Sequence, residues 1–146
     1  MSLIDKFKEP EKRTRMIDAC VLLVDGEVEK KKGFGGIVIK AGYGAVKGIK
    51  PGFVRKVIDG LFDRWAVNLE PFWSEAEAKG TPPVEHLIAK KSAVAEALLS
   101  VTDEKAQRAD HAIVGSTYKK LRPSAKEHVE EAVAGLAKLI ETHARS

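Results

Sequence analysis

Apolar residues recur every three or four positions along each long periodic segment of this chain, and that spacing constrains the fold more than any other feature. The widest apolar face lies in residues 51–69, and it comprises Val54, Val57, Ile58, Leu61, Phe62, Trp65 and Leu69. A period of 3.6 residues places them on one side of a helix. No two alternating runs are joined by a two-residue hairpin turn, and no internal repeat is present. The sequence therefore predicts an all-α fold.

Prolines supply the first set of expected helix boundaries. A proline suits the first turn of a helix and disfavours helix at the residue before it, so helix starts are expected at Pro10, Pro51 and Pro82. Pro71 is expected to end or kink the helix that begins at Pro51. A shorter helical piece should then follow and end at Gly80.

Capping residues supply the second set of expected helix boundaries. Ser92 is expected to cap a short helix, and Thr102, which precedes two acidic residues, to start another. The clearest start is Ser124 with Glu127, which has the spacing of a capping box. Together these signals predict about six or seven helices in an irregular bundle.

The length of 146 residues fits a single compact domain spanning residues 1–146. A content of 44% hydrophobic and 32% charged residues is ordinary for a folded protein. The single cysteine, Cys20, cannot form an intramolecular disulfide, which favours a reducing compartment. The first ten residues include charged ones, and no stretch of the sequence approaches the ~18 apolar residues of a membrane span. We therefore expect a cytoplasmic protein without a transmembrane segment.

A segment without acidic residues lies between Glu29 and Asp59. It carries seven of the twelve glycines and eight basic residues: Lys30, Lys31, Lys32, Lys40, Lys47, Lys50, Arg55 and Lys56. Residues 33–60 alone have a net charge of +4, which equals that of the whole protein. Such a concentration of one sign of charge attracts anions.

Periodicity favours a helix over residues 33–50, although their glycines and β-branched residues also suit other structures. At 100° per residue, Lys40, Tyr43, Lys47 and Lys50 fall within about 80° of one face. A strand would direct Lys47 away from Lys40 and Lys50. We expect the lysines to lie on an exposed arc away from the core. Apolar residues lie on another side of this helix: Ile37, Val38, Ala41, Ala45 and Ile49.

Small residues four positions apart, Gly44 with Gly48 and Ala41 with Ala45, form a ridge along the same helix. A ridge of this kind lets another helix approach closely. We therefore expect Gly44 to pack against a neighbouring helix, and a homodimer formed through the ridge is an alternative.

The predicted function is non-enzymatic binding of an anionic partner by residues 33–56. The predicted binding residues are Lys40, Tyr43, Lys47, Lys50, Arg55 and Lys56. Lipid head groups or an acidic protein fit this number of charges, whereas binding of nucleic acid would require more charges and more aromatic residues. The alternative is that these lysines form an ordinary solvated helix face.

The residues that could act in catalysis or bind a metal form no recognised motif. His86, His111, His128 and His143 match no metal-binding spacing, and Cys20 lies on an apolar stripe where a thiol is inert. We predict no catalytic residue, metal or cofactor. Two alternatives stay open: an enzyme with an unrecognised site, and a carrier of a small hydrophobic ligand. The carrier would use a cleft among the aromatic residues near Pro71, which are Phe62, Trp65, Phe72 and Trp73.

Four stretches together resemble a family of small bacterial proteins of unknown function. They are GFGGIVIKAGYGAVKGIKPGF, Leu69 to Trp73, AEALLSVTDEKA and YKKLRPSAKEHVEEAVAGLAKLI. The resemblance extends over nearly the whole chain. It implies a bacterial origin and a helical build, and it implies no activity, cofactor or catalytic residue.

Overall fold

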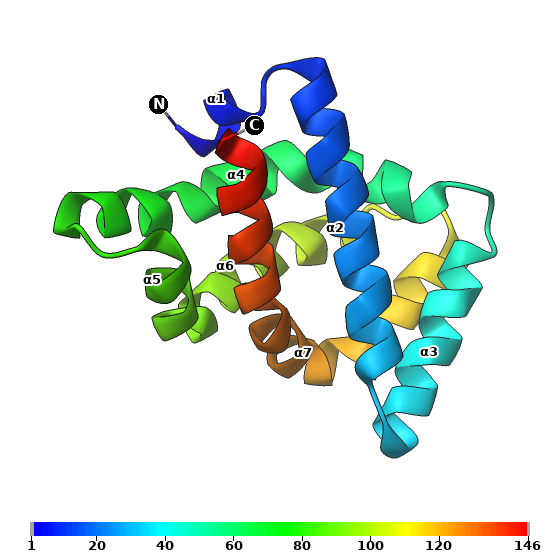
Figure 1. Ribbon diagram of the computed structural model, residues 1–146. Helices are drawn as coiled ribbons and strands as arrows, with labels where there is room; N and C mark the ends of the chain where they lie inside the picture. Colours follow the sequence, from blue (N-terminus) through cyan, green and yellow to red (C-terminus); the bar gives the residue numbers. More distant parts are fainter. Residues whose placement is uncertain (1, 146) are drawn as a thin grey trace.

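The computed structural model describes residues 2–145, and within this range it contains seven helices and no strand, which confirms the predicted all-α class (Figure 1). The helices are α1 (Leu3–Lys6), α2 (Pro10–Lys30), α3 (Gly33–Lys47), α4 (Phe53–Lys79), α5 (Pro83–Ala89), α6 (Lys91–Gln107) and α7 (Ala112–Arg145). The long helices α4 and α7 organise the bundle. Each of the other five packs against α4, and all of these except α1 also pack against α7.

Helix α4 continues through Pro71, so of the two expectations, an end or a kink, the end of a helix there is wrong. Its buried residues keep a spacing of three or four on both sides of the proline: Ile58, Leu61, Phe62, Ala66, Leu69, Trp73 and Ala76. Pro71 itself is exposed. The proline therefore lies on the solvent side of the helix, where bending away from solvent leaves the buried stripe intact.

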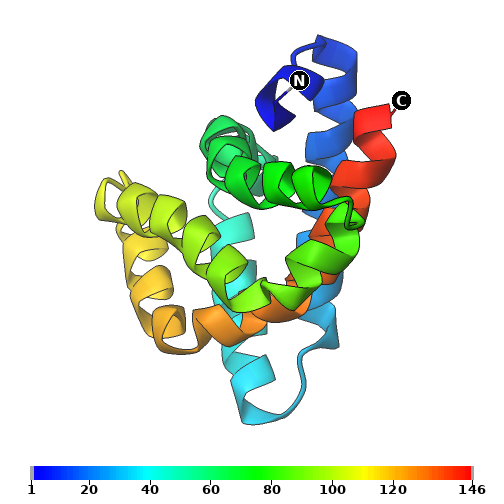
Figure 2. The ribbon, with the colours of Figure 1, turned by 90° about the vertical axis from the view of Figure 1, so that its left-hand side faces the viewer.

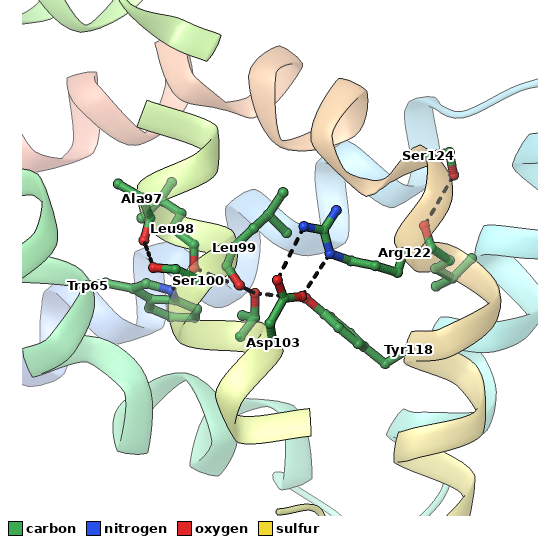
Figure 3. Close-up of polar contacts among 11 residues, drawn as sticks. Trp65, Ala97, Leu98, Leu99, Ser100, Asp103, Tyr118, Arg122 and Ser124 are labelled. Carbon is green, nitrogen blue, oxygen red and sulfur yellow. Dashed lines mark hydrogen bonds and ion pairs between the residues drawn. The ribbon is translucent and has the colours of Figure 1, made fainter. Parts of the chain in front are cut away.

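Helix α7 is continuous from Ala112 to Arg145, so the predicted start at Ser124 is wrong. The Ser124 hydroxyl donates a hydrogen bond to the Leu121 carbonyl at 3.3 Å instead of capping a new helix. Pro123 lies inside the helix and is exposed. Figures 2 and 3 show α7 changing direction around Arg122 and Ser124, as expected where a proline interrupts the backbone hydrogen bonds.

The predicted starts at Ser92 and Thr102 are also wrong. Helix α6 begins at Lys91, and Lys90 at its N-cap makes no side-chain capping bond. Thr102 lies within α6, where its hydroxyl donates to the Leu99 carbonyl at 3.1 Å. Hydroxyl side chains can bond backwards to a carbonyl in the preceding turn, so they also fit a helix interior.

The N-terminal residues belong to the core, which the sequence analysis did not anticipate. Leu3 and Phe7 are each only 2% exposed, and the Phe7 ring meets Phe62 edge-on with the centroids 5.5 Å apart. The Leu3 backbone N–H donates to Glu70 on α4 at 2.6 Å. Nearby, Lys12 Nζ donates to the Ala144 carbonyl at 2.6 Å, so the two ends of the chain lie close together (Figure 1).

A tight connection joins α2 to α3. Only Lys31 and Lys32 separate the two helices, and a Cβ on Gly36 would lie 2.7 Å from the Lys31 carbonyl carbon. Glycine at position 36 therefore allows α3 to start directly beside the end of α2. The predicted helix in this region is confirmed, but it ends at Lys47, so Lys50 lies in the turn before α4.

The predicted role of Gly44 is wrong. Gly44 is exposed, and no neighbouring atom lies within 4 Å of the position where its Cβ would be. The close helix contact is made by Gly42, where a Cβ would lie 2.8 Å from Thr117 Cγ2 on α7. The small residue that the packing requires is therefore two positions away from the predicted one.

These two glycines give opposite expectations for one substitution. Gly44→Ala should stabilise the protein by about 0.5–1 kcal/mol, because alanine costs less than glycine in a helix interior. Gly42→Ala should lose this gain or destabilise, because overpacking typically costs ~1–3 kcal/mol. Urea unfolding of both variants measures the difference. Equal changes in the free energy of unfolding would contradict the packing of α3 on α7.

A cluster of polar side chains joins α6 to the first half of α7 (Figure 3). Asp103 accepts hydrogen bonds from Arg122 Nε at 2.7 Å, from Arg122 Nη2 at 3.2 Å and from the Tyr118 hydroxyl at 2.5 Å. The hydrogen bond from Arg122 is the main cause that lowers the pKa of Asp103 below 3.8. Burial in turn raises the pKa of Tyr118 to about 12.

The contribution of this cluster to stability should depend on pH. Because the folded-state pKa of Asp103 is lowered, the stabilisation is present above its unfolded value near 4 and is lost as the pH falls through the folded value. Arg122→Met should cost about 1 kcal/mol at pH 7, since both side chains are 35% exposed and partly screened. Thermal unfolding should give a smaller loss in acid. An equal loss at pH 7 and in acid would contradict this assignment.

Candidate anion-binding surface

Three of the predicted binding residues are exposed cations without a carboxylate partner. Lys40 lies on α3, Lys50 in the following turn and Lys56 in the first turn of α4, and all three are exposed. Within residues 2–145, none of them has a carboxylate within ion-pair distance. The pKa of Lys50 is lowered, chiefly because the charge of Lys56 lies close to it. Two like charges thus stand together without a neutralising acid.

The other three predicted residues are bound by acids of α2. The Tyr43 hydroxyl donates to Asp25 Oδ1 at 2.5 Å, and Lys47 Nζ lies 3.8 Å from the same oxygen. Arg55 Nε lies 2.8 Å from Asp18 Oδ1. Burial, followed by the bond to Asp25, raises the pKa of Tyr43. These contacts attach α3 and α4 to α2, so we assign Tyr43, Lys47 and Arg55 a structural role. They also belong to the same predicted surface as Lys40, Lys50 and Lys56.

The lysines of α3 are exposed as expected, but its predicted apolar side is not the side that is most buried. Much of its predicted apolar side faces outward: Ile37 is 66% exposed, and Val38 is 36% exposed. Phe34, one turn before Val38, is 82% exposed. The buried side instead carries Ile39, with Tyr43 partly buried four positions later. Because α3 is apolar on more than one side, its periodicity could not identify the side that meets the core.

A second segment without acidic residues lies against the first. Residues 111–126 contain no Asp or Glu and carry Lys119, Lys120, Arg122 and Lys126. They form the first half of α7, against which α3 packs. This segment is absent from the predicted binding surface, although the gap between Asp110 and Glu127 in the sequence marks it directly.

The two acid-free segments separate the charges of the protein along the sequence, although six of their basic residues pair with acids elsewhere: Lys30, Lys31, Lys47, Arg55, Arg122 and Lys126. Together residues 30–58 and 111–126 hold twelve of the 25 Lys and Arg residues and none of the 21 acids. The remainder therefore holds 13 basic and 21 acidic residues, a net charge of −8, although the whole chain is +4. An electrostatic field of this kind orients the molecule toward anions.

A groove of about 430 Å³ runs between α3 and α7. It is lined mainly by apolar and small residues, with Lys120 as the one charged residue: Ile37, Val38, Ala41, Gly42, Ala45, Ile113, Ser116, Thr117, Lys120 and Leu121. Ile113 is itself 41% exposed. We use the name "α3 face" for the surface formed by Lys32, Phe34, Ile37, Lys40, Ala41, Ile113 and Lys120. Figures 1 and 2 place α3 at the end of the molecule opposite the two termini.

Two other pockets are less suited to binding a ligand than the groove between α3 and α7. A cleft of about 650 Å³ near the termini is lined by residues of both charges, and Lys6 and Lys12 in it already have protein partners in Glu77 and the Ala144 carbonyl. The space beside Phe62 and Trp65 measures only about 40 Å³. Ligand pockets usually measure roughly 300–1,000 Å³, so the space beside Phe62 and Trp65 is too small for one, whereas Trp73 lines the larger cleft near the termini.

Groups able to bind a metal do not gather in the part of the chain that the structure describes. In residues 2–145, no three His, Cys, Asp or Glu side chains lie together in an arrangement that could hold a metal ion. His111 stacks edge-on against Phe53 with the ring centroids 5.4 Å apart, and buried His86 lies 3.4 Å from Glu75. Glu131, three positions after His128, pairs with Lys31 at 2.5 Å. These contacts are those of structural residues.

The fold and surface together define an all-α domain with an exposed helix that is both basic and apolar. The chain belongs to the family of unknown function DUF6918, whose family model matches residues 3–144. The predicted resemblance to such a family is confirmed, and the bacterial origin stays a prediction. No curated protein and no solved structure matches the chain. None of the helices within residues 2–145 has the length and apolar character needed to cross a membrane.

The thiol of Cys20 should be inert in the folded protein. Cys20 is 8% exposed, and burial raises its pKa to about 11. Because the thiolate is the reactive form, alkylation at pH 8 should be about a hundredfold slower than in the unfolded chain. Mass spectrometry of samples with and without guanidinium measures both rates. Similar rates in the two conditions would contradict the buried position.

Proposed function

We propose that this protein is a non-catalytic binding protein of the cytoplasm that contacts an anionic surface through residues 33–56. The observation that supports the proposal is the exposure of Lys40, Lys50 and Lys56 without carboxylate partners in an acid-free segment. Ordinary solvated helix faces carry both signs of charge, as residues 1–29 do here. Unneutralised like charges raise the free energy of the unbound protein, and a bound anion relieves this repulsion.

The charge distribution of the whole chain supports the same surface. Lys119 and Lys120 on α7 extend the basic region beyond residues 33–56, and both are exposed. The net charge of −8 outside the two acid-free segments would disfavour contact with an anion at other places. The protein would therefore meet an anionic surface in one preferred orientation.

Charge reversal at the three exposed lysines without carboxylate partners tests this function. The triple variant Lys40→Glu, Lys50→Glu and Lys56→Glu should bind heparin and anionic vesicles at least about a hundredfold more weakly, at roughly 1 kcal/mol for each basic residue lost and further repulsion from each acid added. Binding of the parent should also weaken steeply with salt, because exposed charges are screened over about 8 Å at physiological ionic strength. Co-sedimentation and heparin chromatography measure both effects.

A matched triple variant controls for net charge. Lys91, Lys105 and Lys138 are exposed lysines outside the two acid-free segments, and their replacement by Glu also changes the net charge from +4 to −2. This control should keep most of the binding. Equal losses in both triple variants, or a parent protein that binds neither probe at low salt, would leave the lysines as an ordinary solvated face.

A further inference from the structure

We propose that the anionic surface is a lipid bilayer and that the α3 face inserts Phe34 and Ile37 below the head groups. This inference rests on the proposed function and names its partner. Lysines alone would fit any polyanion. The apolar side chains that stand among them are the feature that distinguishes a membrane from a soluble anion.

The exposed apolar side chains of α3 lie on one side of the helix. Phe34, Ile37 and Ala41 are separated by three and four residues, so they follow one another along the same face. All three are exposed, Phe34 to 82% and Ile37 to 66%. Ile113 of α7 adds a further exposed apolar side chain on the far side of the groove that Ile37 lines. Water contact with this surface is unfavourable in proportion to its apolar area.

Basic residues surround these apolar side chains. Lys32 precedes α3, Lys40 lies one turn beyond Ile37, and Lys120 is one of the residues that line the groove. All three are exposed. Long lysine side chains can rest their methylene groups on an apolar layer while the ammonium group reaches phosphates above it. An apolar centre with a basic border is the arrangement of helices that lie in the membrane interface.

The dimensions of α3 fit a position in the plane of the membrane. Its 15 residues extend about 22 Å, which is shorter than the ~30 Å hydrocarbon layer. Tyr43 and Ile39 attach its other side to the protein, through Asp25 and the core respectively. The helix would thus remain docked on the bundle while its outer side chains enter the upper ~5–10 Å of the bilayer.

A second copy of the chain fits the α3 face less well. A symmetric dimer would place the same surface on both partners, and so it would bring Lys32, Lys40 and Lys120 of each copy together. Like charges brought together in an interface are unfavourable. A bilayer with anionic head groups supplies both the opposite charge and the apolar layer.

The decisive comparison uses two pairs of apolar substitutions. Phe34→Ala with Ile37→Ala removes the inserting side chains, and Leu22→Ala with Val67→Ala removes apolar side chains that are 72% and 54% exposed elsewhere. Vesicles of phosphatidylcholine and phosphatidylglycerol in equal parts are the lipid probe, and heparin is the soluble polyanion. The first pair should weaken vesicle binding at least tenfold and leave heparin binding unchanged. The control pair should change neither.

A fluorescent label measures insertion directly. Cys20 is buried, so an environment-sensitive thiol label attached to a Phe34→Cys variant reports on position 34 alone. On anionic vesicles its emission should shift to the blue and be quenched by lipids with spin labels in their acyl chains. A label on Ala78→Cys, which is exposed near the end of α4, should show neither change.

The outcomes separate this inference from the proposed function. If the Phe34 and Ile37 substitutions leave vesicle binding intact, or the label at position 34 stays in water, while lysine reversal still abolishes binding, insertion is overturned and anion binding stands. If the parent binds neither heparin nor vesicles, both proposals fail. A parent protein that sediments as a dimer, and becomes monomeric on the Phe34 and Ile37 substitutions, would also overturn insertion, because the α3 face would then be covered by a second copy.

Discussion

The burial of one apolar stripe along α4 is the constraint on which the rest of the structure depends. Leu69 and Trp73 flank Pro71 and are 3% and 5% exposed. A proline inside a helix costs roughly 3 kcal/mol, whereas burying a large apolar side chain gains roughly 1.5–3 kcal/mol. With several such side chains on each side of Pro71, the gain exceeds the cost, and α4 stays one helix. Helices α1, α2, α3, α5 and α6 then pack against it.

The second long helix decides where the candidate surface lies. The last half of α7 contributes Val133, Ala137 and Ile140 to the core, whereas its first half contributes no buried residue and runs in a different direction (Figure 2). The bonds from Arg122 and Tyr118 to Asp103 hold this first half on α6. As a result an acid-free part of α7 stands beside α3. Two basic segments that are distant in the sequence thus form one surface.

Side-chain periodicity predicted the fold class and the helical state of α3, because these depend on spacing within a single segment. The predicted starts at Thr102 and Ser124 failed because a hydroxyl satisfies a carbonyl in a helix interior as readily as it caps a new helix. The site was predicted only in part. Lys40, Lys50 and Lys56 are exposed as expected, but which side of α3 meets the core depends on Thr117 and Asp25, which lie on other helices. No pattern within residues 33–47 contains that information.

The glycines of α3 have a consequence for how the molecule moves. Five of its 15 residues are glycine, and each lowers the stability of an isolated helix by roughly 1 kcal/mol relative to alanine. Only Gly36 and Gly42 are required by close neighbours, whereas Gly35 and Gly44 face open space. Helix α3 therefore persists through its contacts with α2 and α7 and not through its own backbone preference. The backbone amides of α3 should be among the first to exchange with solvent hydrogen. The α3 face therefore lies on a cooperative unit of the protein that has low local stability.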